Sequence, residues 1–197
     1  MYLTLRLDQA RELDQADTSS RLASAVQGVL DELGRNGLPE RAIKEGDRAP
    51  DFTLADADGV LHRLADHLRN PLVLSFYRGG WCPFCTQELL TLEEYLPEIR
   101  ALGADLLAIS PEDRQAARTT REEKGVTFTT LIDPGLAVAR SYGLAFPVGP
   151  VWDEEYRAGH VPPSGVGAVG NWPVGRDRKS LAAAGQLSTA VVIVKLR

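Results

Sequence analysis

The sequence predicts an α/β fold in which helices flank a central mixed sheet. Over residues 71–142, apolar segments of strand length alternate with segments of helical length, and the connections between them are short. This alternation is typical of a sheet whose strands are joined by right-handed crossovers. A hairpin pattern precedes this region, and an apolar strand pattern follows it. With 197 residues, of which 44% are hydrophobic, the chain can form one domain with a substantial core.

The first segment, residues 5–33, is predicted to be helical because its leucines and valines recur at helical spacings. Residues 17–20 interrupt the pattern and suit the cap of a second helix. Glycines and a proline end the region by residue 39. We therefore expect a helical extension over residues 1–39, which packs on the core or on another subunit, and a main domain over residues 40–197.

A β-hairpin is expected to open the main domain. Residues 52–56 alternate between apolar and polar, Asp58-Gly59 is a turn signal, and Val60 to Leu64 alternates again. The next segment, Pro71 to Tyr77, is apolar on both faces. That pattern is typical of a buried central strand.

The remaining elements follow from the same patterns. A helix after the cysteines has apolar residues on one face, and Pro97 is expected to kink it. Residues 143–187 are rich in glycine and proline and are expected to be irregular. The other expected elements are strand 104–110, helix 111–124, strand 126–132, a helix capped by Asp133 that runs through Tyr142, and strand 188–196.

Charge and hydrophobicity exclude two classes of partner. The formal net charge is -5 and no cluster of Lys and Arg is present, so the chain is not expected to bind nucleic acid. No apolar run approaches the roughly 20 residues that a membrane span needs. The N-terminal residues carry acidic side chains instead of the apolar core of an export signal. We therefore expect a cytoplasmic protein with no membrane partner.

The two cysteines, Cys82 and Cys85, form a C-x-x-C motif where the predicted central strand gives way to a helix. A cysteine reacts as its thiolate, and a helix N-terminus lowers the pKa of a thiol from about 8.5 to between about 3.5 and 7.5. Pro83 suits the first helical position. Arg78 is expected to add positive charge and Trp81 an apolar wall. The motif therefore predicts redox chemistry without a metal or an organic cofactor.

Two other interpretations of the cysteine pair are less favoured. A structural zinc site requires four ligands, but His62, His67 and His160 are scattered along the sequence and do not stand at ligand spacings. These histidines are expected to be surface or hydrogen-bonded residues. Two inert core cysteines are the other alternative, since free cysteine is often simply buried.

Four separated motifs resemble the peroxiredoxin-like group of the alkyl hydroperoxide reductase/thiol-specific antioxidant family. In order along about residues 40–150 they are APDFTL, LVLSFYRGGWCPFCTQEL, LPEIRALGADLLAISPE and GVTFTTLIDPGLAVARSYGL. The resemblance implies a thioredoxin-like fold and a thiol peroxidase. It departs from the family near the last expected strand. Residues 187–193 contain no counterpart of the catalytic arginine, and Ser188 stands where relatives usually have a proline.

The resemblance assigns the two cysteines in two ways. In the family's Pro-x-x-x-Thr-x-x-Cys signature, Arg78 takes the place of the proline, Cys82 that of the threonine and Cys85 that of the peroxidatic cysteine. Thr86 and Glu88 continue the pattern. Compared with thioredoxin, the same segment resembles the redox loop, and Cys82 is the attacking thiol. Both assignments remain open at this point.

The function that the resemblance implies is reduction of hydrogen peroxide or alkyl hydroperoxides, with Cys85 attacking, Cys82 resolving, and thioredoxin or a similar dithiol as reductant. The residues expected to contact the substrate are Thr86, Tyr77, Trp81 and Arg78. A protein disulfide reductase in which Cys82 attacks is the alternative, and a non-catalytic binding module is a third interpretation. The N-terminal helices and the habit of the family make a homodimer the expected assembly.

Overall fold

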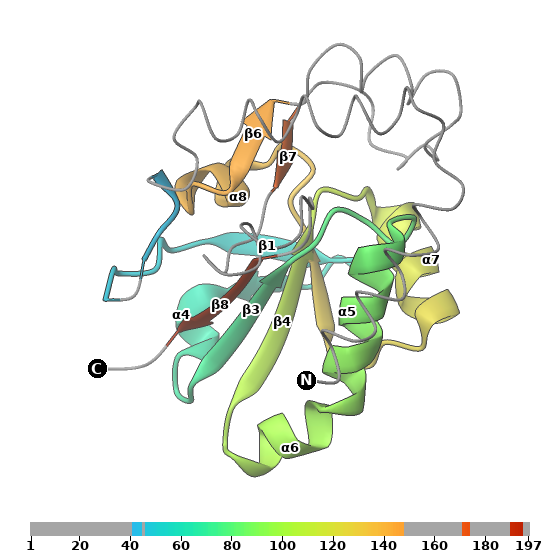
Figure 1. Cartoon of the computed structure of the whole chain (residues 1–197), viewed down its shortest axis with the longest axis horizontal. Coiled ribbons are helices and arrows are strands. Elements are labelled where there is room, and N and C mark those ends of the chain that lie inside the picture. The colour runs from blue at the N-terminus through green and yellow to red at the C-terminus, as the bar shows by residue number, and fades with distance from the viewer. Residues whose placement is uncertain (1–40, 45, 148–170, 174–189, 195–197) are drawn as a thin grey trace.

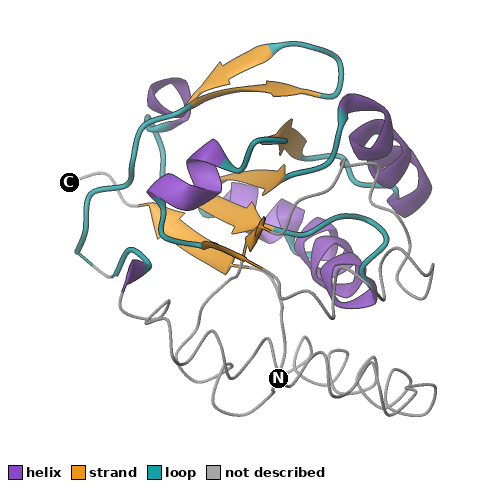
Figure 2. Ribbon diagram, turned by 90° about the horizontal axis from the view of Figure 1, so that it is seen from above, coloured by secondary structure: helices purple, strands orange, loops and turns teal. Residues whose placement is uncertain are grey.

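The computed structural model describes residues 41–44, 46–147, 171–173 and 190–194 (Figure 1). The predicted helices of residues 5–33 lie outside this part of the chain, as does most of the segment 143–187 that was predicted to be irregular. The described residues of that segment correct the prediction, because they include two short paired strands at residues 145–147 and 171–173. The described residues form a central sheet with helices on both of its sides, as Figure 2 shows in the view from above. No helix among them is long and apolar enough to cross a bilayer.

The main sheet is mixed, as the sequence predicts. Its strand order is β2-β1-β5-β4-β3-β8, in which β3, β4 and β5 are parallel and the other neighbouring pairs are antiparallel. A separate two-stranded sheet pairs β6 with β7. The strands are β1 (Thr53–Asp56), β2 (Leu61–Arg63), β3 (Leu72–Phe76), β4 (Asp105–Ser110), β5 (Thr129–Ile132), β6 (Ala145–Pro147), β7 (Asn171–Pro173) and β8 (Ala190–Val194).

Helices cover both faces of this sheet. Helices α5 and α7 lie on one side of the strands, while α4 and α8 lie on the other (Figure 1). The bounds of the helices are α4 (Leu64–His67), α5 (Pro83–Glu94), α6 (Leu96–Ala101), α7 (Arg114–Lys124) and α8 (Ala137–Ser141). The central strand β3 therefore has a hydrophobic layer on each face, as its continuous apolar sequence predicts.

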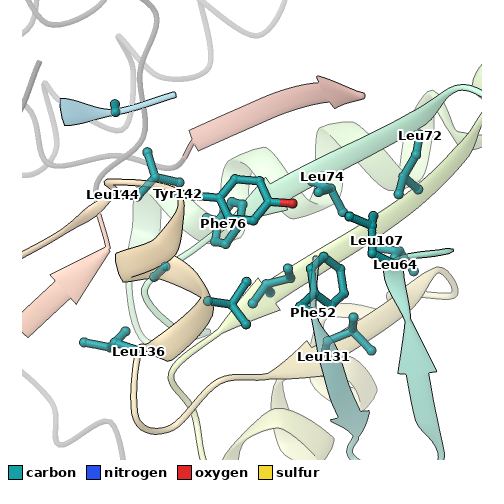
Figure 3. Packing of buried hydrophobic residues seen from close by; sticks show 14 residues of the cluster. Phe52, Leu64, Leu72, Leu74, Phe76, Leu107, Leu131, Leu136, Tyr142 and Leu144 are labelled. Atoms are coloured by element: carbon teal, nitrogen blue, oxygen red, sulfur yellow. The ribbon is translucent and has the colours of Figure 1, made fainter. Parts of the chain in front are cut away.

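Alternate residues of β3 contribute to two separate cores. Leu72, Leu74 and Phe76 belong to the core beneath α4 and α8, where the Phe76 and Tyr142 rings lie 5.1 Å apart (Figure 3). Val73, on the other face, packs against a second core that includes Leu89 of α5. Cys82 and Cys85 belong to this second core. The cysteines are thus fixed by packing as well as by the backbone.

The structure corrects three predicted helix boundaries. The helix that was expected to bend at Pro97 is instead two helices, since α5 ends at Glu94 and α6 begins at Leu96. Proline explains the break, because it has no N–H to donate to the preceding turn. Helix α7 begins at Arg114 instead of residue 111, where the Asp113 side chain accepts the Ala116 N–H at 2.8 Å.

The last helix, α8, begins at Ala137, three residues after the predicted first helical residue, Pro134. Asp133 does have the capping function that its sequence position indicates. Its carboxylate accepts the N–H groups of Ala137 and Ala139, each at 2.9 Å. The residue directly before the helix is Leu136, with φ 54°. The turn through this left-handed residue delays the helix relative to the prediction.

Candidate active site

The C-x-x-C motif lies at the carboxyl end of β3, where the chain enters α5. Cys82 is the N-cap of this helix, with extended backbone angles, and Pro83 is its first residue. The Cys85 N–H points to the Cys82 sulfur at 3.4 Å, and the Thr86 N–H donates to the Cys82 carbonyl at 2.9 Å. One N–H group of the first helical turn, that of Cys85, and the positive end of the helix dipole therefore face the Cys82 sulfur.

The guanidinium of Arg78 makes direct contact with this sulfur. Its Nη2 donates to Cys82 Sγ at 2.8 Å, and the Arg78 backbone N–H points to Cys85 Sγ at 3.4 Å. The Arg78 Cζ atom also lies 5.2 Å from the centre of the Trp81 ring, within the range of a cation–π interaction. The sequence predicts positive charge near the cysteine pair, and in the structure the Arg78 guanidinium contacts the sulfur of Cys82.

The two thiols have opposite pKa shifts. Burial alone would raise the pKa of Cys82, but the hydrogen bond from Cys85 and the charge of Arg78 outweigh it and lower that pKa to about 6. Burial, together with the hydrogen bond to Cys82 and its negative charge, raises the pKa of Cys85. At neutral pH this arrangement favours a Cys82 thiolate beside a Cys85 thiol.

A buried carboxyl group lies in the same part of the core. Glu88, one turn after Cys85 on α5, accepts a hydrogen bond from the Ser75 hydroxyl at 3.0 Å. Burial raises the pKa of Glu88 to about 8 against the effect of that hydrogen bond, and the negative charge of Cys82 raises it further. The Glu88 carboxyl is therefore mostly protonated at neutral pH. The sequence marks Glu88 only as part of a family pattern.

A second buried carboxylate, Glu112, holds the loop before Cys82. It accepts hydrogen bonds from the Tyr77 hydroxyl at 3.0 Å and from the Gly80 N–H at 3.0 Å. Sequence reasoning missed this residue. One signal was present, because Glu112 follows the buried strand β4, and the carboxyl ends of the parallel strands β3 and β4 meet at the same edge of the sheet.

The other predicted substrate-contacting residues surround the same loop. The Thr86 hydroxyl donates to the Gly80 carbonyl at 3.1 Å, and Trp81 is partly buried against Arg78. Tyr77 is fully buried, and its hydroxyl donates a hydrogen bond to the Glu112 side chain. The structure therefore brings all four residues to the cysteine pair.

The described histidines lie in a different place. His62 contacts Asp56 and His67 contacts Asp105, each at 3.1 Å, and the two rings stack at 5.6 Å. They are hydrogen-bonded residues, as predicted. Within the described ranges, no three His, Cys, Asp or Glu side chains are grouped so that they could hold a metal ion. His160 lies outside these ranges.

Known proteins resemble this chain over the region of the site. The model of the AhpC/TSA family matches residues 45–161. Peroxiredoxin Bcp of Escherichia coli (strain K12) is 30% identical over 113 residues, which are 57% of this chain and 68% of that protein. The thiol-disulfide oxidoreductase ResA of Geobacillus thermodenitrificans (strain NG80-2) is 34% identical over 104 residues, which are 52% of this chain and 59% of that protein.

Among solved structures, the crystal structure of peroxidoxin BcpB from Mycobacterium tuberculosis is similar with a TM-score of 0.49 and 29% identity. The similarity covers 51% of this chain and 66% of that one. The chain spans 64% and 51% of the length of the first curated relatives that it matches.

Proposed function

Because the chain belongs to the AhpC/TSA family, we propose that it is a thiol-dependent peroxidase that reduces hydrogen peroxide or alkyl hydroperoxides through Cys82 and Cys85. Family membership agrees with the mixed sheet and confirms the predicted thioredoxin-like fold. The observation that carries the proposal is the 2.8 Å contact between the Arg78 guanidinium and the Cys82 sulfur, next to a second thiol. A thiolate with a resolving partner requires neither a metal nor an organic cofactor.

The first step is attack of the Cys82 thiolate on one oxygen of the peroxide. A sulfur–oxygen bond forms while the O–O bond breaks, so the sulfur is oxidised to a sulfenic acid and the peroxide is reduced. The other oxygen leaves as an alkoxide, or as hydroxide from hydrogen peroxide, and takes up a proton. Arg78 supports this step because its charge favours the thiolate and lies beside the reacting sulfur.

The second step is attack of Cys85 on the sulfenic sulfur of Cys82. The disulfide forms while the sulfur–oxygen bond breaks, and the hydroxyl group leaves as water with the proton of Cys85. Thioredoxin or a similar dithiol then reduces the disulfide by exchange and is itself oxidised. The cytoplasm suits this cycle because its thiol pools keep cysteines reduced. The homodimer expected from the N-terminal helices and from the habit of the family remains a prediction.

Cys82, and not Cys85, is the attacking residue in this proposal. The family signature favours Cys85, but two features of this chain favour Cys82. The guanidinium of Arg78 donates to the Cys82 sulfur, and the pKa of Cys82 is lowered to about 6 while that of Cys85 is raised. The thiolate is the nucleophilic form of cysteine, so the ionised residue attacks first.

Access to the pair requires movement of the residues around it. Neither Cys82 nor Cys85 has exposed surface. A peroxide can therefore reach the sulfur only when neighbouring side chains move aside. This burial favours small substrates over large ones.

A protein disulfide reductase is the second candidate function. A first cysteine with a lowered pKa and a second with a raised pKa also suits disulfide exchange, in which the first attacks and the second resolves. The relative named ResA is a thiol-disulfide oxidoreductase. The same pair of residues would serve either reaction, so the two functions differ in the substrate that reaches Cys82.

The deciding experiment treats reduced wild type, Cys82→Ser and Cys85→Ser with hydrogen peroxide and follows sulfenic acid by mass spectrometry. We expect Cys85→Ser to accumulate a sulfenic acid on Cys82 rapidly and Cys82→Ser to react slowly. Rapid oxidation of Cys85 in Cys82→Ser would reverse the two roles. If both variants react slowly while the wild type reduces a test disulfide, the chain is a reductase.

A further inference from the structure

Glu112 is a buried carboxylate with four neutral hydrogen-bond donors around it. Only 2% of the surface of Glu112 is exposed to solvent. Oε2 accepts from the Tyr77 hydroxyl at 3.0 Å and the Ser110 hydroxyl at 3.1 Å. Oε1 accepts from the Gly80 N–H at 3.0 Å and the Thr120 hydroxyl at 2.7 Å. Each oxygen thus has two donors, and the four hydrogen bonds together hold the carboxyl group in one position.

Two of these donors stand on either side of Arg78 in the sequence. Tyr77 precedes it and Gly80 follows it by two residues, while Ser110 and Thr120 anchor the carboxylate to β4 and α7. The carboxylate therefore connects the segment that carries Arg78 to two rigid elements. The Arg78 guanidinium reaches the Cys82 sulfur from this segment.

The backbone of the segment has little freedom to adopt another position. Gly79 has φ 154°, in the region that favours glycine. A Cβ atom at Gly80 would overlap the side chain of Thr120. The loop is thus packed directly against α7 at the point where Glu112 accepts its N–H.

From this geometry we propose that Glu112 is a positioning residue for the reaction, because its carboxylate holds residues 77–80 so that the Arg78 guanidinium lies on the Cys82 sulfur. The inference rests on Cys82 as the reacting thiolate of the proposed function. Without Glu112, the Tyr77 hydroxyl and the Gly80 N–H lose their shared acceptor. The loop then relaxes, and the hydrogen bond from Arg78 to Cys82 weakens.

Glu112→Gln is the direct test. The amide keeps the size of the side chain but replaces one acceptor oxygen with an NH2 group. This group is a donor, so it cannot accept the two hydrogen bonds that the oxygen accepted. We expect the pKa of Cys82, titrated by the ultraviolet absorbance of its thiolate, to rise by about one unit. At pH values below the wild-type pKa, a rise of about one unit lowers the thiolate fraction about tenfold, so alkylation of Cys82 by iodoacetamide is expected to slow by about the same factor. Glu112→Asp keeps the charge and should recover part of both losses.

The matched control is Glu123→Gln, an exposed carboxylate on α7. It should leave both the pKa of Cys82 and the alkylation rate unchanged. A purely structural role for Glu112 predicts a different result, in which Glu112→Gln lowers the melting temperature while the pKa of Cys82 stays at the wild-type value. That result would overturn the proposal.

A second variant keeps the test decisive if Glu112→Gln does not fold. Thr120→Val removes one donor to Oε1, the oxygen that also accepts the Gly80 N–H. We expect a smaller rise in the pKa of Cys82, and an unchanged pKa contradicts the proposal. Both readouts are independent of peroxide. A chain that shows the pKa shift but does not reduce peroxide would refute the peroxidase function alone.

Discussion

Arg78 and Cys82 form a direct pair inside the protein, with Nη2 of the arginine 2.8 Å from the sulfur. Both residues are buried, and they stand four positions apart on the loop that leads into α5. A cation at this distance stabilises the thiolate strongly, because burial removes the water that would otherwise screen the two charges.

Replacement of Arg78 by glutamine should raise the pKa of Cys82. An opposite charge in contact with an acid typically lowers its pKa by about 1–3 units, so its loss should raise the value from about 6 by a similar amount. At neutral pH the thiolate fraction and the rate of reaction with peroxide then fall. The measurement is titration of the thiolate absorbance, with the exposed Arg100→Gln as the control. A titration identical to that of the wild type would refute the role of Arg78.

The ionisation of one cysteine should depend on the presence of the other. In Cys82→Ala, Cys85 loses both its hydrogen bond to Cys82 and the nearby negative charge, so its pKa should fall relative to the wild type. In Cys85→Ala, Cys82 loses the donor that supports its thiolate, so its pKa should rise. The pH dependence of alkylation in each variant measures these values. Movement of both values in the same direction contradicts the coupling.

Glu88 should make the folded protein less stable as pH rises. Its pKa is about 8 in the folded protein and near 4.5 in an exposed carboxyl, so the folded state binds the additional proton between these values. The contribution of Glu88 to the free energy of unfolding is fully present below about pH 4.5. It declines by about 1.4 kcal/mol per pH unit above that value and is lost above about pH 8. Urea unfolding across this range measures it.

Glu88→Gln is the control for that pH dependence. Cys82 acts in the opposite direction, because its lowered pKa adds stability as pH rises from about 6 toward the value of an exposed thiol. The difference between wild type and Glu88→Gln isolates the carboxyl group. If this difference does not change with pH, Glu88 is not protonated in the folded protein.

Leu74→Ala should destabilise the strand that leads to the cysteines. Leu74 is fully buried on β3, and removal of a buried leucine side chain typically costs about 2–5 kcal/mol. Leu61→Ala is the control, because Leu61 is 68% exposed on β2 and its loss should cost less than about 0.5 kcal/mol. Chemical denaturation of both variants compares the two positions. Equal costs would contradict the assignment of Leu74 to the core.

Most of the sheet could be predicted because its strands have clear patterns. The continuous apolar segment at β3 and the turn signal at Asp58-Gly59 both led to the correct elements. The break between α5 and α6 was harder, because the leucines keep their helical spacing across Tyr95 and only the missing N–H of Pro97 ends the helix. The start of α8 follows a turn over residues 133–136, in which the Leu136 N–H donates to the Asp133 carbonyl. Pro134-Gly135 is a signal for this turn, but the prediction took Pro134 as the first helical residue.

The candidate site could be predicted only where its residues are close in sequence. Arg78, Cys82 and Cys85 lie within one short loop, and their proximity follows from the strand-to-helix junction. The contact of Glu112 with Tyr77 joins residues that stand on different strands or loops, and neither periodicity nor spacing indicates which side chains meet across a sheet. The contact of Ser75 on β3 with Glu88 on α5 also joins two different elements, and the sequence pattern does not indicate it.

The pairing of β3 with β8 determines when during synthesis the site can be completed. The strand that leads to the cysteines has β4 on one side and β8 on the other, with Ser75 opposite Ala108 and Val191. A nascent chain that ends before β8 leaves one edge of β3 with unpaired N–H and C=O groups, which can pair with strands of other chains. The ribosome must therefore translate β8 before both edges of β3 are paired. A premature stop codon downstream of the entire C-x-x-C motif should still yield a protein prone to aggregation.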